Sequence, residues 1–195
     1  MTIVAASRKT VLRNEALARR GAVDPSIRSS FPARLAEQGL ALARRVEADV
    51  VSAFLPIRDE PDTLPLLAAL SAHGFRTALP VTGARGAPLI FRQWRVGDPT
   101  RPGPMGLREP LAEAQVVEPD LLFAPLACFD RRGHRIGFGA GHYDRSLAAL
   151  RAAGPVTAVG VAFSASQIDE IPDETHDQRL DFILTERELI DCRTG

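Results

Sequence analysis

The sequence has few cysteines and no long apolar run. The two cysteines, Cys128 and Cys192, match no metal-binding spacing. Free thiols of this kind fit a reducing, cytoplasmic setting, and Cys128 lies in an apolar run that is typical of the core. No apolar stretch reaches the length of a membrane span, and the first residues lack the apolar centre of a signal peptide. We therefore expect a cytoplasmic protein that does not enter a membrane.

The sequence also lacks an excess of charge and the common nucleotide-binding motifs. Basic and acidic residues number 24 each, so the net charge is zero and nucleic acid is not the expected partner. No GxxxxGK[ST] loop occurs, and no glycine motif is followed by the acidic residue of a dinucleotide fingerprint. With 195 residues and 45% hydrophobic content, we expect one domain spanning residues 1–195.

Lysine is almost absent. Lys9 is the only lysine among the 24 basic residues, and a compact ammonium group is a common ligand for phosphate. Residues 1–48 contain nine basic and four acidic residues, a net charge of +5, whereas residues 169–195 contain three and nine, a net charge of −6. These two segments could meet at a site that holds an anion and a metal, although solvated helix faces would give the same pattern.

The most informative stretch is rich in glycine and covers residues 135–145 (RIGFGAGHYDR). Gly137, Gly139 and Gly141 let backbone N–H groups turn toward an anion. The helix expected after them adds free N–H groups and partial positive charge. Asp144 has the wrong charge for a phosphate, so a bridging Mg²⁺ is its natural partner. The stretch predicts a phosphate cradle beside a metal ligand, with a glycine-rich turn between a hairpin and a helix as the alternative.

Helical and strand patterns alternate along the chain. We expect helices over residues 7–20, 24–48 with a break near Pro32, 61–73 and 143–153. We expect strands over residues 49–57, 75–81, 89–96, 120–125, 156–163 and 181–185. Residues 97–119 hold five prolines and three glycines and are expected to be irregular. The alternation predicts an α/β fold: one three-layer domain with a mostly parallel sheet, helices on both faces, and a ligand beyond the carboxyl ends of the strands.

Residues 125–147 (PLACFDRRGHRIGFGAGHYDRSL) resemble a signature of the 5-formyltetrahydrofolate cyclo-ligase family, also called 5,10-methenyltetrahydrofolate synthetases. The family pattern is a proline, an apolar stretch ending in Phe-Asp, then G-x-R-[LI]-G-x-G-x-G-[YF]-Y-D. Further matches follow in order over nearly the whole chain: Lys9 and Arg13 in a K-x-x-x-R pattern, residues 54–63, Leu79-Pro80, Phe91 and Trp94, Glu109-Pro110, and Pro172 followed by His176-Asp177. The chain departs from the pattern at Cys128, Ala140 and His142.

The resemblance implies a ligase that uses ATP and Mg²⁺ to convert 5-formyltetrahydrofolate to 5,10-methenyltetrahydrofolate, ADP and phosphate. ATP would phosphorylate the formyl oxygen, and N10 would close the ring. The catalytic residues implied are Lys9 and Arg135. The ATP-binding residues implied are Lys9, Arg13, Arg135, Ile136, Gly137, Phe138, Gly139, Ala140, Gly141, His142 and Tyr143. The folate-binding residues implied are Leu55, Glu60, Trp94, Phe138, Gly139, Ala140, Gly141 and His142, and the metal ligands implied are Asp144 and Asp177.

Ordinary structural roles remain open for several of these residues. Lys9 and Arg13 could be surface charges, Asp177 a loop cap, Trp94 a core residue and His142 a ring that packs. Two other functions are a non-catalytic protein that sequesters 5-formyltetrahydrofolate and a sugar-phosphate isomerase. A binding protein would not need a triphosphate clamp, and an isomerase would need one phosphate site with a base beside it. The expected partners are small molecules, without nucleic acid or membrane, and we expect a monomer.

Overall fold

The computed structural model describes residues 2–84 and 86–193, with side chains from Arg8 onward. Within these ranges the helices are α1 (Thr2–Gly21), α2 (Pro25–Arg45), α3 (Leu64–Ala72) and α4 (His142–Ala153). The main sheet contains β1 (Val50–Ser52), β2 (Arg76–Val81), β3 (Ile90–Gln93), β6 (Leu121–Pro125), β9 (Thr157–Val161), β10 (Phe182–Leu184) and β11 (Leu189–Asp191). Two small hairpins join β4 (Thr100–Pro102) to β5 (Arg108–Pro110) and β7 (Cys128–Phe129) to β8 (Arg135–Ile136). Single 3-10 turns, η1 (Pro104–Gly106) and η2 (Ser164–Ser166), follow β4 and β9.

The sheet is mostly parallel, as the sequence predicts. Its order is β11-β10-β9-β6-β1-β2-β3, and the five strands from β10 to β2 in this order run parallel to one another. The two edge strands, β3 and β11, pair in the antiparallel sense. The central strands are buried on both faces because helices cover the sheet from both sides, which explains their continuous apolar runs.

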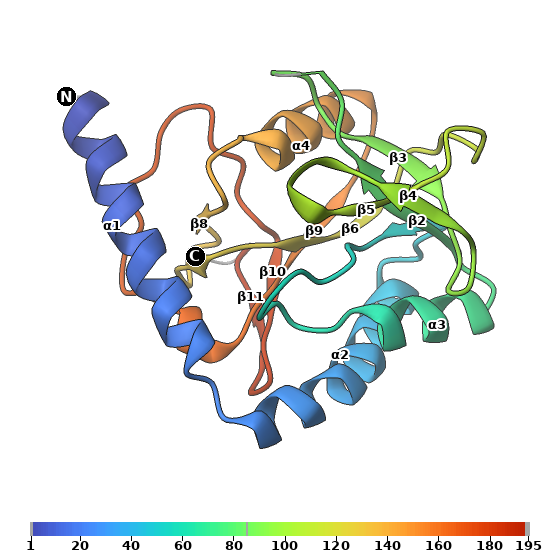
Figure 1. Cartoon of the computed structure of the whole chain (residues 1–195), viewed down its shortest axis with the longest axis horizontal. Coiled ribbons are helices and arrows are strands. Elements are labelled where there is room, and N and C mark those ends of the chain that lie inside the picture. The colour runs from blue at the N-terminus through green and yellow to red at the C-terminus, as the bar shows by residue number, and fades with distance from the viewer. Residues whose placement is uncertain (1, 85, 194–195) are drawn as a thin grey trace.

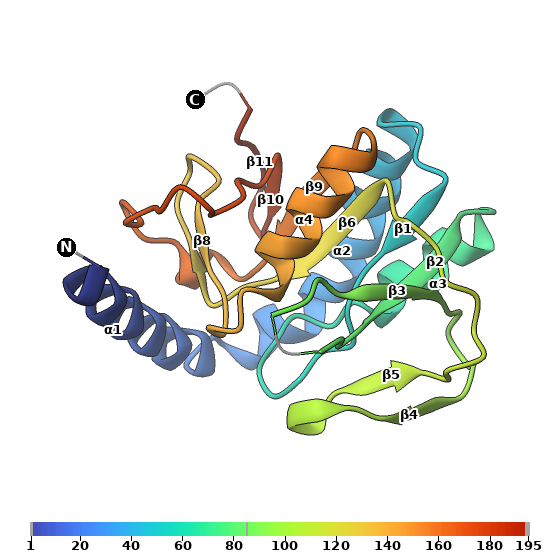
Figure 2. The ribbon, with the colours of Figure 1, turned by 90° about the horizontal axis from the view of Figure 1, so that it is seen from above.

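Helices form a layer on each side of the sheet (Figures 1 and 2). On one side, Phe31 of α2 and Leu66 of α3 belong to the same buried cluster as Phe123 of β6. On the other side, Leu147 of α4 packs in a cluster with Leu122 of β6. This is the three-layer α/β arrangement that the sequence predicts.

Helix α1 lies across the ends of the strands rather than on a face of the sheet (Figure 1). Leu12 and Ala16 pack against Cys128 and Ile136 of the β7–β8 hairpin and against Ile171. Helix α1 also contacts η2, which follows β9. Since β7 and η2 follow the carboxyl ends of β6 and β9, α1 closes the edge of the sheet where α/β proteins bind ligands.

Three helices differ from the prediction. Helix α1 begins at Thr2 rather than at residue 7. Helix α2 continues through Pro32, where we expected a break. Phe31 is 1% exposed and Leu35 is completely buried, so packing on both sides of Pro32 compensates for the missing N–H hydrogen bond. Helix α3 begins at Leu64 after Thr63 rather than at Pro61.

Residues 97–119 are more regular than predicted, because they contain the β4–β5 hairpin. Glu109 is 3% exposed and accepts hydrogen bonds from the Thr82 N–H group (2.8 Å) and from Arg101 (3.2 Å). A buried glutamate therefore fastens the hairpin to the end of β2. This contact joins distant residues, so the local pattern of prolines and glycines does not reveal it. Strand β11 was also missing from the prediction.

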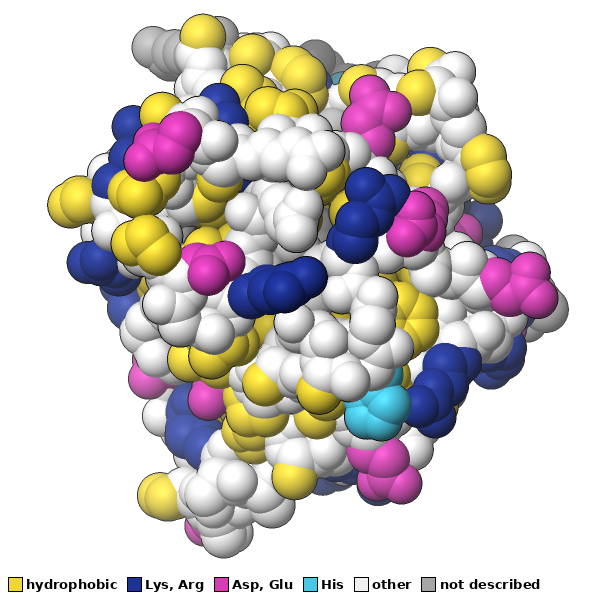
Figure 3. Space-filling model, turned by 90° about the vertical axis from the view of Figure 1, so that its right-hand side faces the viewer, with side chains coloured by type: hydrophobic (Ala, Val, Ile, Leu, Met, Phe, Trp, Pro, Cys, Tyr) yellow, Lys and Arg dark blue, Asp and Glu magenta, His cyan; other side chains and the backbone are white. Residues whose placement is uncertain are grey.

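The face opposite α1 mixes acidic, basic and apolar side chains without a continuous basic surface (Figure 3). Nucleic-acid-binding proteins usually concentrate basic residues on one face, so this side of the molecule offers no such surface. Within the described ranges, no helix combines the length and apolar character needed to cross a bilayer.

Candidate active site

A cavity of about 670 Å³ lies between α1 and the carboxyl ends of the strands. This volume is typical of small-molecule sites. Its lining comes from α1, the end of β6, the loops after β1, β2 and β8, the turn between β4 and β5, the start of α4 and the loop that contains residues 174–177. The lining residues are Lys9, Thr10, Arg13, Leu17, Arg20, Phe54, Leu55, Ile57, Arg58, Glu60, Leu79, Pro80, Thr82, Leu89, Met105, Leu107, Arg108, Pro125, Arg135, Ile136, Gly137, Phe138, Gly139, Ala140, Gly141, His142, Tyr143, Asp144, Glu174, His176 and Asp177.

One face of α1 supplies a row of side chains to the cavity: Lys9, Arg13, Leu17 and Arg20. Their spacing of four, four and three residues places them on the same side of an α-helix. Lys9 and Arg20 are separated by eleven residues, or roughly 16 Å along the helix axis. The row therefore spans enough length to contact two substrates bound side by side.

The glycine cradle, residues 137–141, leads directly into α4. Gly139 and Gly141 have φ angles of 97° and 65°, in the left-handed region that glycine occupies easily. Gly141 caps the start of α4, so the free N–H groups of the first turn lie next to the cradle. Nε of Arg13 donates a 2.7 Å hydrogen bond to the carbonyl oxygen of Gly137, which ties α1 to the cradle. The backbone here has the shape that the sequence predicts for an anion site.

Arg135 and Asp144 form an ion pair beside the cradle. Nη2 of Arg135 donates to Oδ1 of Asp144 at 2.7 Å, and Nη1 donates to the carbonyl oxygen of Gln178. The same Oδ1 accepts the Gln178 N–H group at 3.1 Å. Burial lowers the pKa of Arg135 and the charge of Asp144 opposes this effect; a guanidinium nevertheless stays protonated in proteins. A positive charge is thus fixed next to the glycine cradle.

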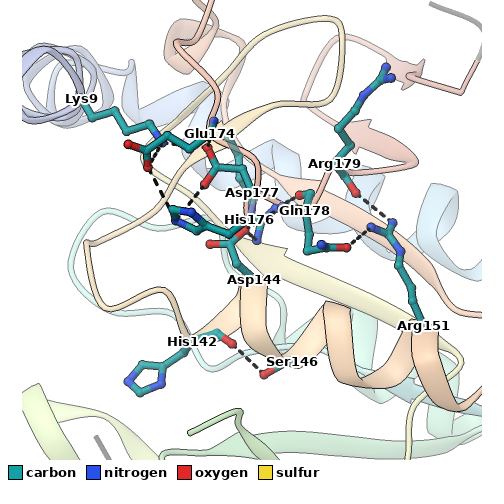
Figure 4. Close-up of polar contacts among 11 residues, drawn as sticks. Lys9, His142, Asp144, Ser146, Arg151, Glu174, His176, Asp177, Gln178 and Arg179 are labelled. Carbon is teal, nitrogen blue, oxygen red and sulfur yellow. Dashed lines mark hydrogen bonds and ion pairs between the residues drawn. The ribbon is translucent and has the colours of Figure 1, made fainter. Parts of the chain in front are cut away.

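Lys9 lies in an acidic cluster formed by the loop after η2 (Figure 4). Its Nζ atom is 2.7 Å from Oδ2 of Asp177 and 3.2 Å from Oε2 of Glu174. Nε2 of His176 lies 3.6 Å from Oε2 of Glu174 and 3.8 Å from Oδ1 of Asp177. Burial lowers the pKa of Lys9, but its hydrogen bonds to Asp177 and Glu174 outweigh burial and the pKa is raised overall. The basic and acidic segments therefore meet, as their charges suggest.

Arg20, the last residue of the row on α1, lies next to the buried carboxylate of Glu60. Glu60 is 9% exposed, and its Oε2 accepts the Ile57 N–H group at 3.0 Å. Nη1 of Arg20 is 3.9 Å from Oε1 of Glu60. Burial raises the pKa of Glu60, and the Ile57 N–H group and Arg20 oppose the rise. Burial and then the charge of Glu60 raise the pKa of Tyr143, which keeps this phenol neutral.

Most of the predicted site residues line this one cavity. They are Lys9, Arg13, Leu55, Glu60, Arg135, Ile136, Gly137, Phe138, Gly139, Ala140, Gly141, His142, Tyr143, Asp144 and Asp177. Asp144 and Asp177 belong to different ion pairs, with Arg135 and Lys9 respectively.

Trp94 is the exception among the predicted site residues. It is 5% exposed, lies in the core cluster beneath α2 and α3, and donates from Nε1 to the carbonyl oxygen of Asp98 at 3.1 Å. Phe91 is also buried, in the cluster on the α4 side. Neither ring lines the cavity, so the structure does not bring either one to a folate.

Several lining residues were not predicted, including Leu17, Arg20, Glu174 and the hairpin residues Met105 and Leu107. The helical spacing from Lys9 would have found Leu17 and Arg20. Nothing local signals the hairpin residues, since their position depends on the buried contact of Glu109 with β2.

The cysteines take no part in the site. Cys128 and Cys192 are free and buried, and burial raises the pKa of each thiol to about 11. The nucleophilic form of cysteine is the thiolate, so neither residue is poised to react at neutral pH. Both are core residues, as predicted for Cys128.

Known proteins resemble the chain over most of its length. The sequence profile of the 5-formyltetrahydrofolate cyclo-ligase family matches residues 5–186. A 5-formyltetrahydrofolate cyclo-ligase of Mycolicibacterium smegmatis is 34% identical over 91% of this chain and 93% of its own length. One from Escherichia coli K12 is 30% identical over 86% and 94%. The solved structure of the 5,10-methenyltetrahydrofolate synthetase of Aquifex aeolicus has a TM-score of 0.73 and 26% identity and covers 96% of this chain and 94% of that one.

Proposed function

Because the chain belongs to the 5-formyltetrahydrofolate cyclo-ligase family, we propose that it converts 5-formyltetrahydrofolate and ATP to 5,10-methenyltetrahydrofolate, ADP and phosphate. The observation that carries the proposal is the continuity of one cavity. It has a glycine cradle with cationic side chains at one end and a buried carboxylate with apolar walls at the other. A triphosphate suits the first end, and a pterin with several N–H donors suits the second.

The nucleotide half is built from the cradle, the start of α4 and three cations. Lys9 and Arg13 approach from α1, and Arg135 approaches from β8. Backbone N–H groups with fixed positive side chains stabilise a transferring phosphoryl group without reorganisation during the reaction. We assign Lys9, Arg13, Arg135 and residues 136–143 to ATP, with Lys9 and Arg135 acting on the reacting phosphates.

Carboxylates beside these cations fit a magnesium ion that accompanies ATP. Asp144 and Asp177 offer the oxygen ligands that Mg²⁺ prefers, and Mg²⁺ bound to phosphates needs only one or two protein carboxylates. In the free protein each carboxylate is neutralised by a cation of the same site, Arg135 or Lys9. A bound Mg²⁺ would supply charge neutralisation to the phosphates. The cations could then turn to the phosphates and the carboxylates to the metal, without leaving a charge unpaired.

The folate half is assigned to the loop after β1 and the cradle. Glu60 would accept hydrogen bonds from the amino edge of the pterin, with Leu55 and Phe138 as apolar contacts. Residues 138–142 line the cavity and would contact both substrates, because phosphoryl transfer requires the two substrates to meet. Met105 is 73% exposed on the β4–β5 hairpin and also lines the cavity, so the hairpin would contact the part of the folate nearest the opening.

The proposed chemistry uses positioning more than protein nucleophiles. The formyl oxygen attacks the γ-phosphorus atom and ADP leaves, which turns a poor leaving group into a phosphate ester. N10 then attacks the formyl carbon and loses its proton, and phosphate departs with the formyl oxygen. Orientation of the reactants and stabilisation of charge account for catalysis of this kind.

The test is to incubate the protein with 5-formyltetrahydrofolate and MgATP while following the methenyl chromophore. Product should form only when ATP and Mg²⁺ are both present. Turnover in EDTA or without nucleotide would refute the ligase assignment. Tight binding of 5-formyltetrahydrofolate with no turnover under any condition would instead favour the sequestering protein.

A further inference from the structure

Two ionisable side chains at the Glu60 end of the cavity carry unsatisfied polar atoms. Arg20 is 4% exposed and Glu60 is 9% exposed. Within the described part of the chain, Nε and Nη1 of Arg20 and Oε1 of Glu60 have no hydrogen-bond partner. Buried polar groups are nearly always paired, and both residues line the cavity. The exceptions therefore indicate a pair that is completed by a ligand.

Arg20 and Glu60 are close enough to attract each other but do not share a hydrogen bond. Nη1 of Arg20 lies 3.9 Å from Oε1 of Glu60, which allows electrostatic attraction but is too long for a hydrogen bond. Oε2 of Glu60 accepts only the Ile57 N–H group among the hydrogen bonds of the described residues. Glu60 thus has a counter-charge beside it while its acceptor capacity is largely unused.

We propose that Arg20 is a positioning residue for folate, which keeps Glu60 ionised while leaving Oε1 free to accept hydrogen bonds from the pterin. The inference rests on the proposed function and adds a residue to its substrate site. An ionised carboxylate only accepts hydrogen bonds, whereas a protonated carboxyl group presents a donor toward the N–H groups of a pterin. Loss of the Arg20 charge should therefore weaken folate binding through the protonation of Glu60.

The groups that face Glu60 support this role. Burial raises the pKa of Glu60, and the Ile57 N–H group and Arg20 oppose the rise. From α4, Tyr143 faces Glu60 as a neutral phenol, with Arg135 near it. Arg20 is consequently the cation that balances Glu60 within the described part of the chain.

Charged groups and one aromatic ring surround Arg20. Asp59 adds a favourable charge, while Arg28 and Arg58 add unfavourable ones. The guanidinium carbon lies 5.8 Å from the centre of the Phe138 ring, in the glycine cradle. Arg20→Met keeps an apolar stem and removes the guanidinium group, with its charge, its polar atoms and its contact with Phe138.

The experiment measures the affinity for 5-formyltetrahydrofolate by calorimetry without ATP, from about pH 6 to about pH 9. In the wild-type protein we expect an affinity that is nearly constant near neutral pH. In Arg20→Met we expect a loss of about tenfold near pH 7, recovered as pH rises, because a raised pKa leaves Glu60 ionised only at higher pH. Arg20→Lys should restore most of the affinity. Arg19→Met removes the same charge from an exposed neighbour on α1 and should change nothing.

The double variant separates positioning from general packing. Glu60→Gln should weaken folate binding at every pH, and adding Arg20→Met should neither deepen the loss nor introduce pH dependence. An Arg20→Met loss that is equal at all pH values, or that adds fully to the Glu60→Gln loss, would overturn the inference. If the wild type makes methenyltetrahydrofolate but Arg20→Met gives either of these results, only the positioning role of Arg20 is refuted. If the wild type does not bind 5-formyltetrahydrofolate, the proposed function fails with it.

Discussion

Replacing Lys9 with methionine tests whether α1 belongs to the nucleotide site. Methionine keeps the length of the apolar stem and removes the ammonium group. Lys9 is held by Asp177 at 2.7 Å and Glu174 at 3.2 Å in the free protein, with its side chain 15% exposed. If the ammonium group contacts a phosphate oxygen in the complex, the variant loses a charge-assisted hydrogen bond.

The expected size of the effect follows from competing contributions. A hydrogen bond to a charged group contributes about 1.5–3 kcal/mol. Part of this contribution is offset because ATP must draw the ammonium group of Lys9 away from Asp177 and Glu174. Such a pairing is worth about 1 kcal/mol at an exposed site, and somewhat more where both side chains are partly buried, as here. In the variant, Glu174 also faces the phosphates without compensation, which works in the opposite direction to that offset. We therefore expect a loss of about 2 kcal/mol, or roughly 30-fold in the dissociation constant of ATP.

The assay is calorimetric titration with a non-hydrolysable ATP analogue in excess Mg²⁺, together with the KM for ATP. Arg8→Met is the matched control, because Arg8 is an exposed neighbour on α1 that does not line the cavity. Adding Glu174→Gln to Lys9→Met should recover part of the loss by removing one repelling carboxylate. An unchanged ATP affinity in Lys9→Met would refute the assignment of α1 to the nucleotide site.

Three further predictions follow from the same structure. Glu60→Gln should weaken 5-formyltetrahydrofolate binding and leave ATP binding unchanged, because an amide turns one acceptor into a donor; titration of each ligand separately checks this, and a loss confined to ATP would reverse the two subsites. Asp177→Asn and Asp144→Asn should each raise the Mg²⁺ concentration needed for half-maximal activity. Asp144→Asn should also lower the melting temperature, because Arg135 loses its buried counter-charge. If only Asp144→Asn shifts the dependence of activity on Mg²⁺, Asp177 is a structural loop residue. Gly133→Ala should lower the free energy of unfolding by about 2 kcal/mol or more, a fall of roughly 4–8 °C in melting temperature, because the φ angle of Gly133 is +87° and a Cβ atom would lie 2.5 Å from the Leu180 carbonyl oxygen. The control Gly154→Ala, which has open space around its position, should melt like the wild type. An unchanged melting temperature for Gly133→Ala would contradict the argument.

Local sequence patterns predicted the elements whose formation depends on neighbouring residues. The central strands are short apolar runs such as residues 121–125. Helices bury these strands on both faces, so nearly every residue in them is apolar and the run can be recognised in the sequence. Gly139 and Gly141 were predicted to form a cradle because glycine lets backbone N–H groups turn toward an anion, and both residues adopt positive φ angles that glycine reaches easily. The row Lys9, Arg13, Leu17 and Arg20 could also be read from helical spacing alone.

The errors arose where contacts between distant residues overrode local preference. Pro32 does not break α2, because Phe31 and Leu35 anchor the helix against the core on both sides of it. The β4–β5 hairpin forms because Glu109 is buried against the Thr82 N–H group. Trp94 was expected to contact folate, but the pairing of β2 with β3 places it in the core.

The sequence by itself determined the α/β class, the glycine cradle and the identity of the charges available for the site, since each depends on residues within one element. Only the tertiary structure decided which charges meet. Lys9 contacts Asp177 across 168 residues, and Arg20 contacts Glu60 from a different element without sharing a hydrogen bond. Such pairings depend on how α1 packs over the ends of the strands, and no periodicity within a segment encodes the distance between two segments that fold together.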